Sequence, residues 1–184
     1  KPSVKFSRKT KQYITDGSMK DEKWRSGLKL LEKYNLNYDL RVPCWHLEEA
    51  VEIVRLIPNT KVIINHAGFP WDRSKEGMEF WRKGIKLISL EPNTFIKLSE
   101  FGVNGQDWNY AENANIIYEL IDLFSPDRCM FASNFPVSKL KITFNDLFNN
   151  YKKIVKEFSI DEKKALFSKT AIDTYSIEQN LLNK

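Results

Sequence analysis

The sequence has little of what marks a secreted or membrane-embedded protein. Its 184 residues include only two cysteines, Cys44 and Cys129, which are too few for a disulfide framework and form no CxxC pair. No apolar run approaches the roughly 18–20 residues that a membrane-spanning helix needs. These absences exclude a disulfide-stabilised miniprotein and a membrane span, and they predict a protein of the reducing cytoplasm.

Long stretches of one charge are also missing. The chain has 29 Lys and Arg against 24 Asp and Glu, a formal net charge of +5, but the two signs alternate through segments such as 20–23 and 156–164. Solvated helix faces have this composition, whereas binding to nucleic-acid phosphates needs clustered positive charge. We therefore expect neither a nucleic-acid nor a membrane partner. The sequence also lacks a phosphate-binding GxxxxGK[ST] or GxGxxG loop, a GxSxG elbow and an HExxH helix.

Short apolar runs alternate with longer segments of helical periodicity. A helix is predicted from Met19 to Tyr34, and a short final helix between Ser159 and Tyr175, where Ser159 and Glu162 form a capping pair. We expect one domain over residues 1–184, with an irregular segment at 1–18. Between the two helices the pattern predicts four strand–helix pairs, at 37–42 and 46–56, 61–65 and 78–90, 94–98 and 112–124, and 129–133 and 144–158.

This alternation predicts the α/β fold class, because successive strand–helix units require crossover connections and a parallel sheet. Two architectures fit the pattern: an open doubly wound sheet and a (β/α) barrel. A complete barrel has eight strands and typically about 250 residues, so four strands supply half of one.

Polar and small residues follow each predicted strand, where parallel α/β folds place their functional groups. His66 ends the most apolar strand and is one of only two histidines. A neutral imidazole can bind a metal, transfer a proton or polarise a substrate, although a hydrogen-bonded histidine that merely closes a strand is the commoner role for an isolated residue. His46 begins a predicted helix, where it can be a first-turn residue or a substrate contact. Arg41, at the exit of the first strand, is a further candidate for substrate binding.

The exits of the last two strands contribute Ser99, Glu100 and Asn134. Ser99 and Glu100 can form a ligand-binding pair or cap a loop. Asn134 can hydrogen-bond a ligand or mark a turn, but a carboxamide cannot accept a proton as a carboxylate does.

Five stretches, in this order, resemble the amidohydrolase-related family, in the branch that contains sugar-acid lactonases. The likeness as a whole runs from about Trp24 to Tyr175, which is nearly the whole chain. The stretches are Trp24–Leu28 with Leu30–Leu31, Asn37–Leu40, Ile64–Pro70, Pro92–Ser99 and Phe124–Val137.

The resemblance implies a (β/α)8 TIM barrel of which this chain covers about strands five to eight. The family has an HxH pair at the end of its first strand, and no HxH is present here. We therefore expect the C-terminal half of a longer protein. An isolated half-barrel exposes strand edges, so we expect it to pair with a second copy or with a missing N-terminal half-barrel, and to be inactive alone.

The resemblance also implies roles for individual residues. His66 corresponds to the histidine of the sixth strand, which binds metal or polarises the substrate carbonyl. Asn134 stands where the family usually has the aspartate that activates water, a departure that removes a proton acceptor worth about 10²–10⁴-fold in rate. Arg41–Pro43 lacks the histidine of binuclear relatives. The expected cofactor is therefore one divalent ion such as zinc, held in part by His66, or none.

The leading hypothesis is a hydrolase that opens a lactone or similar cyclic ester of a small acid, with His66 and Asn134 as catalytic residues. A decarboxylase of the same family is the second hypothesis. A non-catalytic protein that binds a small molecule is the third, because Asn134 replaces the usual acid.

Overall fold

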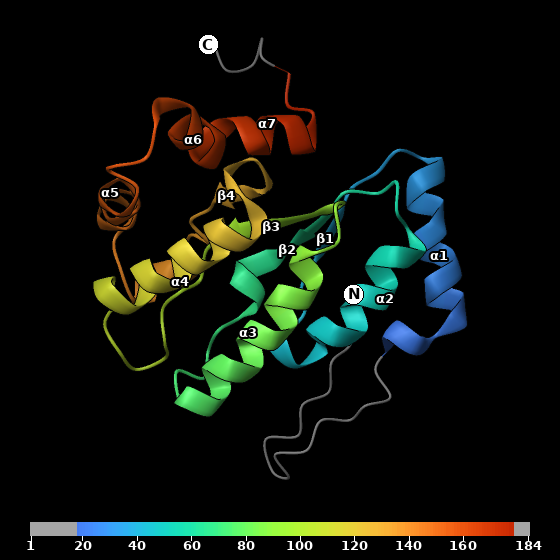
Figure 1. The fold of residues 1–184 in the computed structure, drawn as a ribbon, viewed down its shortest axis with the longest axis horizontal. Helices are drawn as coiled ribbons and strands as arrows, with labels where there is room; N and C mark the ends of the chain where they lie inside the picture. Colours follow the sequence, from blue (N-terminus) through green and yellow to red (C-terminus); the bar gives the residue numbers. More distant parts are fainter. Residues whose placement is uncertain (1–17, 179–184) are drawn as a thin grey trace.

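The structure is a computed structural model, and it describes residues 18–178. The irregular segment predicted at 1–18 therefore lies outside the described residues except for Ser18, which begins a short 3-10 helix, Ser18–Lys20. Figure 1 shows the arrangement of helices and strands. The strands are β1 Tyr38–Leu40, β2 Val62–Ile64, β3 Thr94–Leu98 and β4 Cys129–Phe131. The helices are α1 Glu22–Lys33, α2 Leu47–Leu56, α3 Lys75–Ser89, α4 Tyr110–Phe124, α5 Phe144–Ile154, α6 Ile160–Lys164 and α7 Thr170–Tyr175.

Five of the helices, namely α1, α3, α4, α5 and α6, begin at a side chain that accepts a hydrogen bond from a free N–H group of the first turn. Asp21 accepts a hydrogen bond from the Trp24 N–H at the start of α1, and Ser74 does the same for Gly77 at the start of α3. Ser159 and Glu162 form a complete capping box at α6, as the sequence predicts. A π-helical turn, Ala165–Lys169, joins α6 to α7.

The four strands form one parallel sheet in the order β1-β2-β3-β4. Each strand therefore pairs with the next one in the sequence, without the reversal of strand order that defines a doubly wound sheet. Helices α2, α3 and α4, which make the three crossovers, lie together over one face of the sheet (Figure 1). Of the two architectures that the pattern allows, this winding is that of half a barrel.

The core lies between those helices and the sheet. Residues of the helix-covered sheet face are almost fully buried and pack with Trp81 of α3 and Phe124 of α4. The buried sheet residues of this face are Leu40, Val62, Ile64, Thr94, Ile96, Leu98, Cys129 and Phe131, and Tyr38 on the same face is half-buried.

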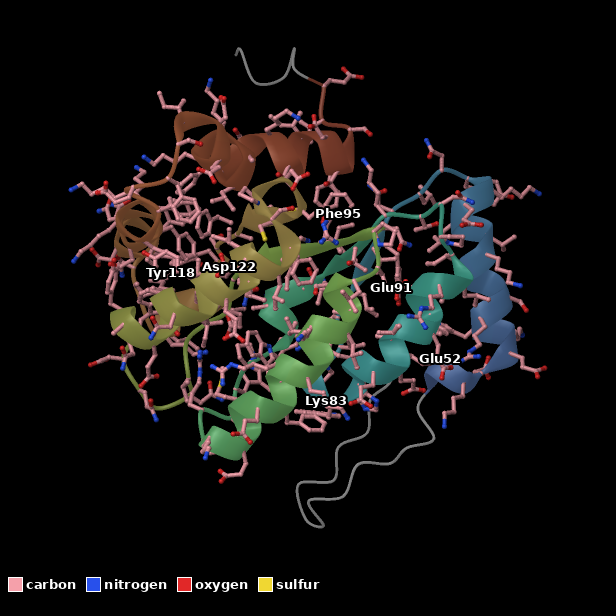
Figure 2. All side chains as sticks on the ribbon, in the orientation of Figure 1. Glu52, Lys83, Glu91, Phe95, Tyr118 and Asp122 are labelled. Carbon is pink, nitrogen blue, oxygen red and sulfur yellow. The ribbon has the colours of Figure 1, made fainter. Side chains whose placement is uncertain are left out.

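The opposite sheet face carries charge. The register places Asp39, Ile63 and Phe95 on this face at one level, and Lys97 and Met130 at the next. Figure 2 shows Phe95 on the side of the sheet that faces α7. We call this the inner face, because a closed barrel would enclose it.

Helix α7 closes the amino-terminal end of the inner face. Its last residues accept hydrogen bonds from Asn37 and Lys61, which precede β1 and β2. Tyr175 donates a 2.6 Å hydrogen bond to Asp39, and the Lys97 ammonium lies 5.2 Å from the centre of the tyrosine ring. Burial, with Asp39 as the second cause, raises the pKa of Tyr175 above its ordinary value. In the described part of the chain, no helix is both long and apolar enough to cross a membrane.

Candidate functional site

Four of the predicted site residues meet at the carboxyl edge of the sheet. The His66 imidazole Nδ1 lies 2.9 Å from the Ser99 hydroxyl, which joins the exits of β2 and β3. The Asn134 amide donates a short hydrogen bond to the Glu100 carboxylate, which joins the exits of β3 and β4. Ser99 and Glu100 are adjacent in the sequence, which links the two pairs through the backbone, and the charge of Glu100 acts on the pKa of His66. We call these four residues the cluster.

A left-handed turn directs His66. Four consecutive residues have positive φ: His66 (57°), Ala67 (54°), Gly68 (65°) and Phe69 (57°). Left-handed backbone costs residues with a Cβ roughly 1–2 kcal/mol each, so the surrounding contacts must hold this turn in place. Trp81 contributes by donating a 2.8 Å hydrogen bond from its indole to the Ala67 carbonyl.

Close packing against α3 also restricts the turn. A Cβ at Gly68 would lie 2.9 Å from Ile85 Cδ1, too close for any other residue to fit without a shift. Glycine at this position therefore allows the turn to pack closely against α3. Glycine is also the residue that adopts positive φ at the lowest energetic cost.

His66 is neutral at physiological pH. Burial lowers its pKa, and the positive charges of Arg41 and Lys97 lower it further, against the opposing effect of Glu100. The tautomer of His66 depends on which partner donates in the hydrogen bond between Nδ1 and Ser99. If Nδ1–H donates to the Ser99 oxygen, Nε2 can accept a proton or bind a metal. If the hydroxyl donates to Nδ1, Nε2–H can donate a hydrogen bond to a carbonyl.

Glu100 is the centre of a polar network that surrounds Asn134. Its carboxylate accepts a 2.8 Å hydrogen bond from the Lys141 ammonium and a 3.2 Å one from the Ser138 hydroxyl, besides that from Asn134. The Glu100 and Lys141 side chains are only 10% and 11% exposed, so this is a largely buried ion pair. Both Glu100 (φ 58°) and Asn134 (φ 52°) have left-handed backbone.

The same network makes Glu100 a weak base. Burial raises its pKa, but the hydrogen bonds from Lys141 and Asn134 and the charge of Lys141 outweigh burial and leave the pKa below its ordinary value. A carboxylate stabilised in this way keeps its charge and takes up a proton reluctantly. Glu100 therefore supplies fixed negative charge and orients the Asn134 amide.

Arg41 reaches the same edge through Phe69. Its guanidinium lies 5.0 Å from the centre of the Phe69 ring, and that ring lies 5.1 Å from the imidazole ring of His66. Arg41 is exposed, so its charge is accessible to an anionic ligand beside His66.

His46 has different surroundings. It is 5% exposed, and its Nδ1 lies 3.1 Å from the Glu49 carboxylate, one helical turn away. No contact among the described residues joins it to His66 or Asn134. A substrate contact by His46 stays a prediction, and its geometry is that of a histidine at the start of a helix.

A metal ion finds few ligands among the described residues. No group of three or more His, Cys, Asp and Glu side chains in residues 18–178 is arranged to hold one. The carboxylate of Glu100 is already paired with Lys141, and the Asn134 amide donates to that carboxylate. His66 Nε2 is the one suitable donor of the cluster, so these residues do not by themselves fit a zinc ion, which usually needs three protein ligands.

Sequence reasoning missed Lys141 and Ser138. Both lie beyond the strand exits, in the segment between β4 and α5, and their contacts with Glu100 span 41 and 38 residues. Neither belongs to a motif, so no local signal in the sequence identifies them.

Comparisons with known proteins agree with this architecture. The family model described as Amidohydrolase matches residues 4–177. An uncharacterized protein of Sinorhizobium fredii, y4mH, is 36% identical over 91% of this chain and 56% of its own length. An L-fucono-1,5-lactonase of Burkholderia multivorans is 25% identical over 64% of this chain and 44% of its own length. The chain spans about half the length of the curated relatives it matches.

Solved structures show the fold. An amidohydrolase from Burkholderia multivorans with bound HEPES superposes with a TM-score of 0.82 at 21% identity, covering 87% of this chain and 60% of that one. A crystal form of an amidohydrolase from the same organism with bound zinc gives 0.82 at 20% identity, covering 87% and 59%. Together with the family match over nearly its whole length, the parallel half-barrel shows that this chain belongs to the amidohydrolase family.

Proposed function

We propose that the protein is a hydrolase that opens a lactone or similar cyclic ester of a small acid. Family membership supports hydrolysis, and relatives named L-fucono-1,5-lactonase and L-rhamnono-gamma-lactonase support this class of substrate. The observation that carries the proposal is the cluster at the carboxyl edge of the sheet. There a neutral His66 contacts Ser99, and the next residue along the chain, Glu100, accepts a hydrogen bond from Asn134.

Hydrolysis needs an acceptor for the proton of the attacking water. Asn134 cannot accept it, and Glu100 is a weak base, so among the clustered residues His66 fills this role best. In the tautomer with Nδ1–H on Ser99, Nε2 takes a proton from water while the water oxygen bonds to the lactone carbonyl carbon. The bond from that carbon to the ring oxygen then breaks, and the ring oxygen takes the proton to become the hydroxyl of the product acid.

The neighbouring groups position the reactants. The Asn134 amide nitrogen donates to Glu100, which leaves the amide oxygen to accept a hydrogen bond from water or a substrate hydroxyl. Arg41, on the other side of His66, provides positive charge for the oxygen atoms of the substrate and for the carboxylate of the product.

Acid release from a panel of sugar-acid lactones, followed with a pH indicator, tests the proposal. We expect His66→Ala to reduce turnover at least about 10²-fold, because it removes the proton acceptor. Asn134→Asp replaces the amide that donates to Glu100 with a second carboxylate. Repulsion raises one pKa of the two carboxyl groups and so provides a stronger base, and turnover should be retained or raised. Lys83→Ala, on the outer side of α3 (Figure 2), is the control and should leave turnover unchanged. Equal turnover by the wild type and His66→Ala would remove His66 from the mechanism.

The assay must allow for the rest of the barrel. Strands β1 and β4 each have a neighbour on one side only among the described residues, and such edges invite pairing. We propose that a second copy, or an N-terminal half-barrel, covers them and completes the site. Light scattering should therefore detect a dimer of the isolated chain. A monomer that stays soluble at high concentration would contradict this part of the proposal.

A non-catalytic binding protein is the second candidate, and one observation favours it. The carboxylate next to Asn134 is neutralised by Lys141, so the site lacks a free acid at that position. Calorimetry with the same lactones separates the two functions, since a binder gives heat of binding without acid release. Release of carbon dioxide from an unsaturated acid would instead identify a decarboxylase.

A further inference from the structure

A recess lies beside the cluster, at the amino-terminal end of α3. It encloses about 320 Å³ between the segment after β1 and the segment that joins β2 to α3. None of its lining residues belongs to the hydrogen-bonded cluster of His66, Ser99, Glu100 and Asn134. The lining residues are Cys44, Trp45, Phe69, Trp71, Asp72, Glu76, Gly77 and Phe80.

Four aromatic rings form most of the wall. The Trp71 ring centre lies 4.5 Å from that of Phe69 and 6.4 Å from that of Trp45, each pair tilted by 54°. The Phe69 ring is almost fully buried and has the Arg41 guanidinium 5.0 Å from its centre, so the exposed aromatic surface belongs to other rings. Trp71 and Phe80 are 41% and 47% exposed, so large aromatic surface faces the recess and water. Such faces carry negative electrostatic potential and attract cations.

The charges of the wall have the same sign. Asp72 and Glu76 are its only charged side chains. The Asp72 carboxylate accepts a 3.0 Å hydrogen bond from the Ser74 N–H, and its Cγ would lie 2.3 Å from a Cβ at position 77. Gly77 thus makes room for Asp72, whose lowered pKa, caused by Ser74, keeps it ionised. Glu76 forms no ion pair among the described residues.

From the aromatic wall and the two carboxylates we propose that this recess binds a small alkylammonium cation, such as a trimethylammonium group. Aromatic faces and carboxylates together favour a cation over a neutral apolar group of the same shape, and they disfavour an anion. The inference goes beyond the proposed hydrolysis and does not depend on it, because binding requires none of the proposed catalytic residues.

Calorimetric titration of the 184-residue chain with choline and with its neutral isostere 3,3-dimethylbutan-1-ol tests the charge preference. We expect choline to bind with a dissociation constant on the order of 1 mM, and the isostere to bind at least about tenfold more weakly. Asp72→Asn/Glu76→Gln should weaken choline about tenfold, and Trp71→Leu should do likewise with an unchanged circular dichroism spectrum. Equal affinity for the two ligands, or no binding of choline, would overturn the proposal.

Cys44 provides a second readout that does not depend on affinity. Its thiol lines the recess, with burial raising its pKa to about 11, whereas Cys129 is fully buried. Two methanethiosulfonate reagents, one with a trimethylammonium group and one with a sulfonate, form the same type of mixed disulfide with release of methanesulfinate. Their rate ratio at Cys44, divided by their ratio for free 2-mercaptoethanol, measures the local preference for positive charge.

We expect this normalised ratio to be roughly 10 in the wild type at low salt and to fall toward 1 in Asp72→Asn/Glu76→Gln. The matched control, Glu112→Gln/Asp122→Asn, removes two carboxylates that lie outside the recess and should leave the ratio unchanged. Cys44→Ser gives the background labelling. A wild-type ratio near 1, or the same ratio in the two double variants, would show that the recess has no preference for cations.

Discussion

The two faces of the sheet are built from different chemistry. On the face covered by α2, α3 and α4, Ile96 and its neighbours are fully buried among aliphatic and aromatic side chains. On the inner face, the adjacent residue Lys97 pairs with Asp39, and these side chains are 21% and 44% exposed. Stability therefore resides mainly on the first face. The second face is free to vary its polar groups, which lead to the site at the carboxyl edge.

The largest loss should follow truncation on the helix-covered face. Ile96→Ala removes a side chain that is 0% exposed and leaves a cavity against α3 and α4, so we expect it to cost about 3 kcal/mol of the free energy of unfolding. Urea denaturation followed by tryptophan fluorescence measures the change. A loss below about 1 kcal/mol would mean that the surrounding helices collapse into the space.

Loss of one partner of the buried ion pair comes next. Lys141→Met leaves the Glu100 charge without its cation, at an expected cost of about 2–3 kcal/mol, somewhat less than for a fully buried pair. Glu100→Gln/Lys141→Met removes both charges and should recover much of that stability. A double variant no more stable than Lys141→Met would show that packing of the Lys141 chain, and not charge, is responsible.

The pH dependence of the free energy of unfolding distinguishes the contribution of Glu100 from that of His66. Both Glu100 and His66 have a lower pKa in the folded state than when unfolded. Each therefore contributes stability that is complete above its unfolded pKa, about 4.5 for Glu100 and about 6.5 for His66, and is lost as the pH falls through the folded value. In a plot of the free energy of unfolding against pH, the slope below about pH 6.5 should be smaller in His66→Asn than in the wild type. The slope below about pH 4.5 should be smaller in Glu100→Gln. Unchanged slopes would contradict the two shifts.

The smallest effect is expected on the inner face. Lys97→Ala breaks an exposed ion pair with Asp39, so the free energy of unfolding should change by less than about 1 kcal/mol. The same denaturation assay compares it with Ile96→Ala, the neighbouring residue of the same strand. Equal losses at the two positions would remove the distinction between the faces.

The sequence predicts the order of the elements because periodicity is a local property. All four strands lie within their predicted ranges, although β1 ends at Leu40 instead of Val42, because its partner β2 ends at Ile64, where the turn begins. Helix α5 ends at Ile154 and not Phe158, since Val155 leaves helical geometry there.

The site is predicted in part. Position after a predicted strand identifies the candidates His66, Ser99, Glu100 and Asn134, because the carboxyl ends of parallel strands share one edge of the sheet. Left-handed backbone at five non-glycine positions was not foreseen, since three of them carry Ala, Phe or Glu, which give no turn signal. The five positions are His66, Ala67, Phe69, Glu100 and Asn134. Lys141 was missed because its contact with Glu100 depends on how a distant loop folds back.

The left-handed turn at residues 66–69 makes the orientation of the His66 imidazole depend on helix α3. Trp81 of α3 donates a hydrogen bond to the Ala67 carbonyl, and Ile85 of α3 packs against Gly68. Substitutions that repack α3 would therefore also turn the imidazole ring. In this molecule the packing of the core and the geometry of the cluster cannot be changed independently.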